Sequence, residues 1–109
     1  MYKAPITEIK FLIKDLFKIN ELFKDQETSF FDEETLDGIL EEVKKLSENL
    51  ISPINRDGDI KPAILKDGKV ILPNSFFKAY KSIAEGGWIG ISGDTKYGGL
   101  GLPLIVTTC

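Results

Sequence analysis

Apolar residues recur every three or four positions in two stretches of the first fifty residues, and each stretch predicts an amphipathic helix. The first helix is expected over about residues 8 to 23, behind Thr7 as its N-cap, and the second from Asp32 to a stop at Pro53. Two such helices joined by a short connection are typical of an antiparallel helical hairpin. The two apolar stripes are Ile9, Leu12, Ile13, Leu16, Ile19 and Phe23, and Leu36, Ile39, Leu40, Val43, Leu46 and Leu50.

The second helix has two further features. Ser29 is an alternative start, because Ser29 and Asp32 form a pair that resembles a capping box. Most of the carboxylates on this helix fall on the side away from the apolar stripe, and we interpret them as a solvated surface rather than a paired acid–base site. These carboxylates are Asp32, Glu33, Glu34, Asp37, Glu41, Glu42 and Glu48.

Residues 52 to 85 predict a less regular stretch followed by a third helix. Residues 55 to 59 have the composition of a turn, and Asp67-Gly68 between two short apolar pairs predicts a β-hairpin. Two strands alone are marginal in water, so the fold class is expected to be mainly α-helical with this hairpin as a small addition. Asn74 is expected to cap a third helix that stops at Gly86. Its apolar side would be Phe76, Phe77, Tyr80, Ile83 and Ala84.

The composition is that of one soluble globular domain. The 109 residues are 42% hydrophobic and 28% charged, which is too apolar for a disordered chain. A net charge of −3 shows no basic excess, so nucleic acid is not an expected partner. We expect a cytoplasmic protein, because no apolar run reaches the length of a membrane span and no signal-peptide pattern opens the chain.

Several kinds of site are excluded or disfavoured by residue type. The sequence has no histidine, which removes Ser-His-Asp and Cys-His catalysis and the commonest metal ligand. Cys109, the only cysteine, is expected to be inert. A calcium-loop resemblance at residues 53 to 58 fails because proline holds the first ligand position. A P-loop resemblance fails because Gly99 stands where lysine is required.

The stretch from Glu85 to Pro103 holds seven of the ten glycines and the only tryptophan. Glycine is favoured where the backbone takes positive φ or passes close to a ligand or another part of the backbone. Such a stretch is costly in conformational entropy unless its path matters. We therefore expect the rest of the chain to be organised around it.

Several motifs in this sequence resemble one protein family, in the same order and over nearly the whole chain. The motif YGGLG alone is only moderately specific, whereas the combination is specific. The motifs are similar to the N-terminal helical domain of flavin-dependent acyl-CoA dehydrogenases, in the branch that contains 3-methylthiopropanoyl-CoA dehydrogenase and related long bacterial enzymes. They are the opening YKAPITEIKFLI, the segment SPINRDGD, the helix with FKAY, and the block EGGWIGIS…YGGLGLP.

The resemblance implies that residues 1–109 form an N-terminal α-helical domain, with a β-barrel domain and a C-terminal helical bundle elsewhere in the parent enzyme. FAD and the acyl-CoA thioester would lie between these domains. A glutamate of the C-terminal part would remove the α-proton while the β-hydride passes to the flavin, leaving a trans-2-enoyl-CoA. The resemblance also implies a homo-oligomer at full length. The residues that it places beside the substrate are Tyr97, Gly98, Gly99, Gly101 and Leu102.

The chain stops at Cys109, before the regions that such enzymes use for flavin binding and proton abstraction, so we expect a fragment. Alone, it should bind no FAD and be inactive. Propensity favours a strand over residues 104 to 108, whereas Pro103 and the resemblance favour a helix. The surface expected to face the other domains contains Trp88, Tyr97 and residues 104 to 106. Two alternatives stay open: a helical module that binds a protein partner, and a structural protein without a ligand.

Overall fold

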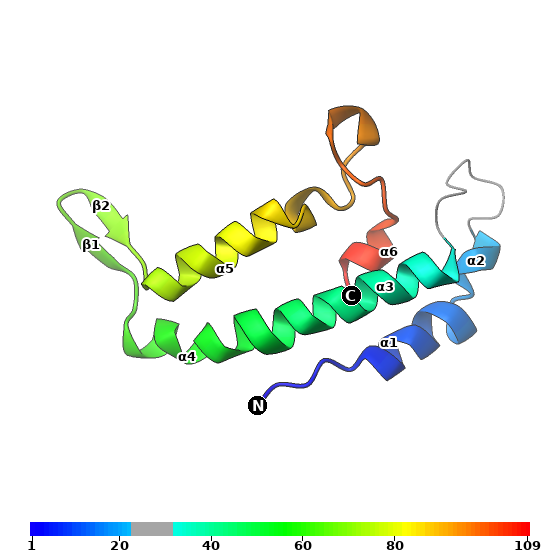
Figure 1. Ribbon diagram of the computed structural model, residues 1–109, viewed down its shortest axis with the longest axis horizontal. Coiled ribbons are helices and arrows are strands. Elements are labelled where there is room, and N and C mark those ends of the chain that lie inside the picture. Colours follow the sequence, from blue (N-terminus) through cyan, green and yellow to red (C-terminus); the bar gives the residue numbers. More distant parts are fainter. Residues whose placement is uncertain (23–31) are drawn as a thin grey trace.

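The computed structural model describes residues 1–22 and 32–109, and it is mainly helical with one small antiparallel sheet (Figure 1). This confirms the expected fold class. The predictions that fall on Phe23 and Ser29 lie outside the described residues. The helices are α1 (Ile6–Phe11), α2 (Ile19–Leu22), α3 (Glu33–Lys45), α4 (Ser52–Ile60), α5 (Asn74–Glu85) and α6 (Leu104–Thr107). The strands are β1 (Ile64–Lys66) and β2 (Lys69–Ile71). Two π-helical turns span Leu12–Leu16 and Leu46–Ile51, and two 3-10 turns span Trp88–Gly90 and Thr95–Tyr97.

The first helix differs from its prediction in its start and in the side that it buries. It begins at Ile6 rather than after Thr7, and α1 continues into a π-helical turn. A π-helical turn carries more residues than an α-helical one, so it rotates the residues that follow it relative to a 3.6-residue repeat. Ile13 is 1% exposed, as the periodicity predicts, whereas Leu16, which the periodicity assigned to the same stripe, is 59% exposed.

The second helix runs through Pro53 to Ile60, so the predicted stop at Pro53 and the predicted turn over residues 55 to 59 are both wrong. The reason lies directly before the proline, where residues 46 to 51 form a π-helical turn. A π-helical turn shifts the hydrogen-bonding pattern, and the helix can then accommodate a proline that lacks an N–H. The predicted start is confirmed, because the Asp32 carboxylate accepts a hydrogen bond of 2.7 Å from the Thr35 N–H.

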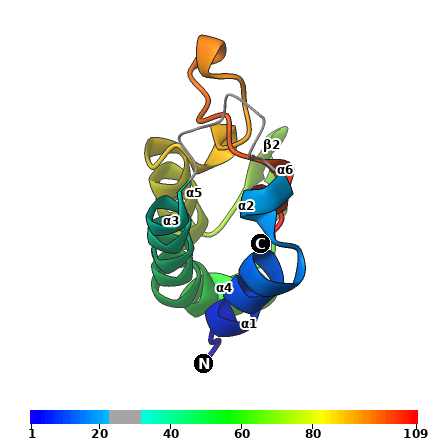
Figure 2. The ribbon, with the colours of Figure 1, turned by 90° about the vertical axis from the view of Figure 1, so that its right-hand side faces the viewer.

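The core lies where α1, α2 and α3 meet α6. In Figure 2, α5 stands on the side of the molecule that α3 occupies, and α6 on the side of α1 and α2. Val106 of α6 is 5% exposed and belongs to this core, so the expectation that it faces other domains is wrong. Of the two alternatives for residues 104 to 108, the helix is right and the strand is wrong, because Leu104–Thr107 form α6 with Pro103 at its N-cap. The buried members of the core are Ile6, Ile13, Ile19, Leu36, Leu40 and Val106.

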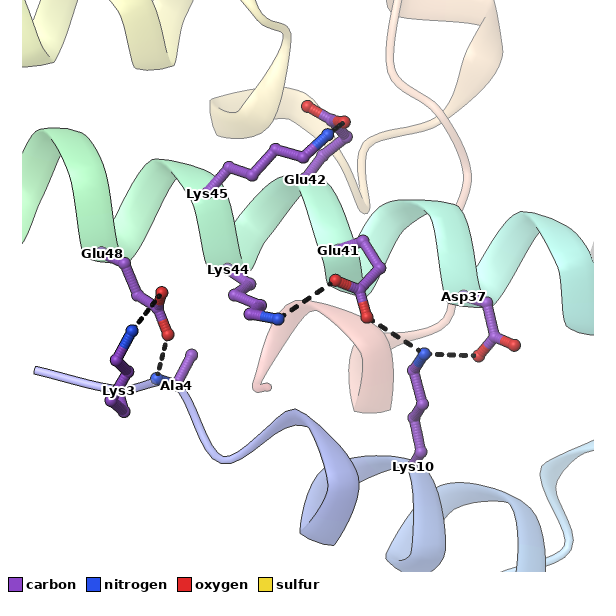
Figure 3. A network of polar contacts seen from close by, with 9 residues as sticks. All are labelled: Lys3, Ala4, Lys10, Asp37, Glu41, Glu42, Lys44, Lys45 and Glu48. Atoms are coloured by element: carbon purple, nitrogen blue, oxygen red, sulfur yellow. Dashed lines mark hydrogen bonds and ion pairs between the residues drawn. The ribbon is translucent and has the colours of Figure 1, made fainter.

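Ion pairs hold α1 and the residues before it against α3 (Figure 3). The Lys10 ammonium lies 3.4 Å from Asp37 and 3.3 Å from Glu41, and the Lys14 ammonium lies 2.9 Å from Asp37. The Ala4 N–H donates a 2.9 Å hydrogen bond to Glu48. Residue numbers therefore rise along one helix as they fall along the other, which confirms the antiparallel pairing.

These contacts also correct the interpretation of the acidic side of α3. Asp37, Glu41 and Glu48 face α1 and its lead-in rather than open solvent. A hydrogen bond from Lys14 lowers the pKa of Asp37, and the same contact raises the pKa of Lys14. The carboxylates thus position α1 on α3 in addition to keeping the helix soluble.

The predicted β-hairpin is confirmed, with Ile64 opposite Ile71 and Leu65 opposite Val70. Its turn residues, Asp67 and Gly68, both have positive φ, as a tight two-residue hairpin turn requires. Every residue of both strands is exposed. The hairpin therefore projects from the molecule between α4 and α5, as Figure 1 shows.

Helix α5 runs beside the long α3–α4 helix but buries little against it. Its only buried residue is Ala79. The Phe76 ring of α5 lies over Gly58 of α4, where an added β-carbon would lie 2.9 Å from the ring. The predicted stop at Gly86 is confirmed, whereas Asn74 is the first helical residue and makes no side-chain cap.

The radius of gyration is 17.0 Å, against about 13 Å for a compact domain of this length, so the molecule is open.

Candidate functional site

The glycine-rich loop between α5 and α6 folds back on itself through main-chain hydrogen bonds. The Leu100 N–H donates to the Gly90 carbonyl over 3.3 Å, Gly101 to Gly93 over 2.8 Å, and Leu102 to Ile91 over 3.0 Å. The Asp94 carboxylate accepts a 2.8 Å bond from the Lys96 N–H at the tip. Two stretches of the loop, residues 90–93 and 98–102, are therefore held side by side.

The glycines of this loop are required for two different reasons. Gly87, Gly98 and Gly101 have positive φ values of 75°, 85° and 64°, a region that residues with a β-carbon rarely adopt. Gly99 does not have positive φ, but its α-carbon passes so close to Gly93 that any β-carbon would overlap the Gly93 carbonyl. Both reasons concern the path of the backbone.

The structure brings the five residues predicted beside the substrate together in this one loop, but it presents their side chains differently. Tyr97 is 81% exposed, and the Lys96 ammonium lies 5.5 Å from the centre of its ring. Leu102 is turned the other way and packs against the core. Gly98, Gly99 and Gly101 have no side chains to offer. Among the five, only Tyr97 therefore projects a side chain outward.

Two apolar side chains of the loop were missed by the sequence analysis. Ile89 is 63% exposed and Leu100 is 57% exposed. The expected exposure of Trp88 is only partly right, because its ring covers Gly86 and the residue is half-buried. The pattern of alternating glycines gave no signal for Ile89 or Leu100, since the direction of a side chain in a loop depends on the folded backbone.

A groove of about 500 Å³ between α4 and α5 was also missed. Its walls are almost entirely apolar, and their polar side-chain groups are the Asn55 amide and the Tyr80 hydroxyl. The groove escaped prediction because the helix was expected to stop at Pro53, before the lining residues Ile54 and Asn55. Its lining residues are Ile51, Ile54, Asn55, Leu72, Phe76, Phe77, Ala79, Tyr80 and Ile83.

The groove does not fit the flavin dinucleotide that the resemblance implies. A diphosphate needs cationic side chains or a set of converging N–H donors. The groove lining contains neither lysine nor arginine. Its apolar walls fit an alkyl group or the apolar side of another helix.

Other chemistry is sparse in the part of the chain that the structure describes. Residues 1–22 and 32–109 contain no group of three acidic or cysteine side chains placed to hold a metal ion. Burial raises the pKa of the Cys109 thiol, and its Sγ lies 3.1 Å from the Ile105 carbonyl oxygen. A raised pKa reduces the thiolate fraction and hence the nucleophilicity of the sulfur.

No helix within residues 1–22 and 32–109 has the length and apolar character needed to cross a membrane.

Comparison with known proteins identifies the family. No family model matches the sequence. A 3-methylmercaptopropionyl-CoA dehydrogenase of Ruegeria pomeroyi is 31% identical over 105 residues, which are 96% of this chain and 18% of that protein. The broad-specificity linear acyl-CoA dehydrogenase FadE5 of Mycobacterium tuberculosis is 27% identical over 107 residues, which are again 96% of this chain and 18% of the relative. This chain belongs to the acyl-CoA dehydrogenase family.

Membership of the acyl-CoA dehydrogenase family confirms the resemblance inferred from the sequence motifs, including its branch. Because the match covers 96% of the chain, it includes the paired helices as well as the glycine-rich loop. The chain spans 18% of the length of each of these relatives.

Proposed function

We propose that these residues form the N-terminal helical domain of an FAD-dependent acyl-CoA dehydrogenase, which converts an acyl-CoA thioester into a trans-2-enoyl-CoA. The observation that carries the proposal is the match to two acyl-CoA dehydrogenases over 96% of this chain and 18% of their length. In this proposal the glycine-rich loop forms one wall of the acyl-CoA site. The flavin, which accepts the hydride, and the base that removes the proton are assigned to other parts of the enzyme.

The fold supports a role as one wall of a larger site. A wall must keep its shape without a ligand, and the loop is cross-linked by three main-chain hydrogen bonds between its two stretches. Its ends are fixed as well, because α5 precedes it and Leu102 is anchored in the core. Preorganisation of this kind reduces the ordering cost when a substrate binds.

The open shape also supports the proposal. The α4–α5 groove exposes the apolar residues Phe77 and Tyr80 to 60% and 64%. Exposed apolar surface of this extent is typical of surfaces that other protein segments cover. We infer that the groove packs against further parts of the same enzyme.

The test is to express the complete open reading frame that contains these residues and to assay it with acyl-CoA thioesters. We expect a yellow protein that reduces an artificial electron acceptor only when an acyl-CoA is present. The assay should include 3-methylmercaptopropionyl-CoA and a series of linear acyl-CoAs. A protein that turns over none of them would contradict the proposal.

The exposed groove favours a second candidate function, a helical module that binds a protein partner through an apolar surface. The two candidates differ in the gene. A reading frame that continues into a β-barrel pattern and a further helical bundle supports the enzyme, whereas a stop codon after codon 109 in an intact gene supports the module.

A further inference from the structure

The aliphatic side chains that the loop exposes are not those of the five residues that the resemblance places beside the substrate. The glycines at 98, 99 and 101 fix the backbone, and Leu102 is turned into the core. Ile89 and Leu100 are the aliphatic side chains that the loop exposes. Leu100 belongs to one of the two paired stretches, and Ile89 directly precedes the other. The 3.3 Å hydrogen bond from the Leu100 N–H to the Gly90 carbonyl joins the stretches next to Ile89.

We propose that Ile89 and Leu100 are the side chains through which this loop contacts the acyl chain, and that they help to set the preference for acyl-chain length. This inference rests on the proposed function, because it takes the loop as a wall of the acyl-CoA site. It goes further by assigning the contact to Ile89, which lies outside the YGGxG motif, and to Leu100, the variable position within it.

The chemistry of the two side chains suits a hydrocarbon ligand. Both are branched, aliphatic and without a polar group, so they gain free energy only when apolar surface covers them. Tyr97 is less suited, since it carries a hydroxyl and has the Lys96 ammonium 5.5 Å from its ring centre. A charge held beside the ring favours a position at the wet edge of a site.

The fixed backbone gives this contact its selectivity. A flexible loop would adapt to chains of many lengths, whereas a loop with three cross-links presents Ile89 and Leu100 at set positions. Each methylene that fits or fails to fit an apolar surface changes kcat/KM by about tenfold or more. A side chain on the wall therefore affects long chains more than chains that do not reach it.

The test uses the complete enzyme and measures kcat/KM for linear acyl-CoAs from four to sixteen carbons. Ile89→Ser and Leu100→Ser should lower kcat/KM about tenfold for the chains that reach the loop, and by less than about twofold for shorter ones. Leu100→Phe should shift the preference toward shorter chains. The matched control is Leu65→Ser in the β-hairpin, where the leucine is 76% exposed, and its profile should equal that of the wild type.

The outcomes separate this inference from the proposed function. An active wild type whose chain-length profile is unchanged in all three loop variants overturns the inference and leaves the proposed function standing. A wild type that oxidises no acyl-CoA overturns both. Because Ile89 and Leu100 are exposed, their variants should keep the wild-type melting temperature, and a uniform loss of activity at every chain length would also contradict a specificity role.

Discussion

Gly99 passes directly against the carbonyl group of Gly93, so a β-carbon on Gly99 would overlap that carbonyl. The contact is between two stretches of backbone and cannot be relieved by a change of rotamer. Gly99 is therefore required by the path of the loop, independently of any ligand. The family resemblance places Gly99 beside the substrate, which is a separate reason from the path of the backbone.

We predict that Gly99→Ala destabilises the protein by about 1–3 kcal/mol, the usual cost of forcing extra volume into a packed site. Urea unfolding followed by circular dichroism measures the effect, and fluorescence of Trp88 should report a changed loop environment. The matched control is Gly38→Ala in α3, where an added β-carbon meets nothing within 4 Å. That control should stabilise the helix by about 1 kcal/mol. Equal effects of the two substitutions would contradict the close contact.

An introduced aspartate should have very different effects at two nearby positions of the first helix. Ile13→Asp should unfold the protein, because Ile13 is 1% exposed and the carboxylate would lose water without gaining a partner. Leu16→Asp should change the free energy of unfolding by less than about 0.5 kcal/mol, because Leu16 is 59% exposed. Thermal melting compares the two variants. A comparable loss from the two variants would show that the helix follows the regular 3.6-residue repeat instead.

The contrast between Ile13 and Leu16 shows how far the sequence could predict this fold. Periodicity located the paired helices and the third helix, because several apolar residues contribute to each stripe and no single one decides it. It misassigned Leu16, which lies within a π-helical turn, and ended a helix at Pro53, which lies shortly after another such turn. A π-helical turn is set by tertiary packing and leaves no repeat in the sequence.

The candidate site was predictable to the same limited degree. Spacing and glycine content identified the loop, and the motif named residues that fix its backbone. The sequence could not tell that Leu102 points into the core while Leu100, two residues earlier, points outward. Those directions follow from the hydrogen bonds between residues far apart in the loop. The groove was missed for a related reason, since one of its walls continues past Pro53.

The ion pair between Lys14 and Asp37 should make the stability depend on pH at the acidic end. The pKa of Asp37 in the folded protein is lowered from its ordinary value of 3.8 by the hydrogen bond from Lys14. A lowered pKa means that the contribution to stability is present above about pH 4 and is lost as the pH falls through the folded-state value. Asp37→Asn should therefore lower the urea midpoint at about pH 7 and have little effect at about pH 2.

Asp15→Asn is the control for this pH dependence. Asp15 is an exposed carboxylate next to Lys14 in the sequence, and it forms no ion pair with a lysine among the described residues. Its urea midpoint should track that of the wild type at every pH. If Asp37→Asn and the wild type differ by the same amount at both ends of the range, Asp37 does not act through its charge.

The α4–α5 groove leads to a prediction about residues 1–109 produced alone. Phe77 and Tyr80 expose 60% and 64% of their surface there, and an apolar groove of about 500 Å³ should bind a hydrophobic dye and promote self-association. The double variant Phe77→Gln/Tyr80→Gln should lower dye fluorescence and shift the sedimentation profile toward monomer. Because the groove lining lacks cationic side chains, FAD fluorescence should not change on addition of the protein.

The control for the groove is Leu65→Gln in the β-hairpin, which removes a side chain of still greater exposure, 76%, from a site outside the groove lining. If exposure alone caused dye binding and association, this variant would reduce both as strongly as the groove variant does. We expect it to leave both close to the wild-type values, because a shallow two-stranded surface encloses a dye less than a groove with walls from two helices. A groove variant that still associates and binds dye like the wild type would show that the α4–α5 groove is not the adhesive surface.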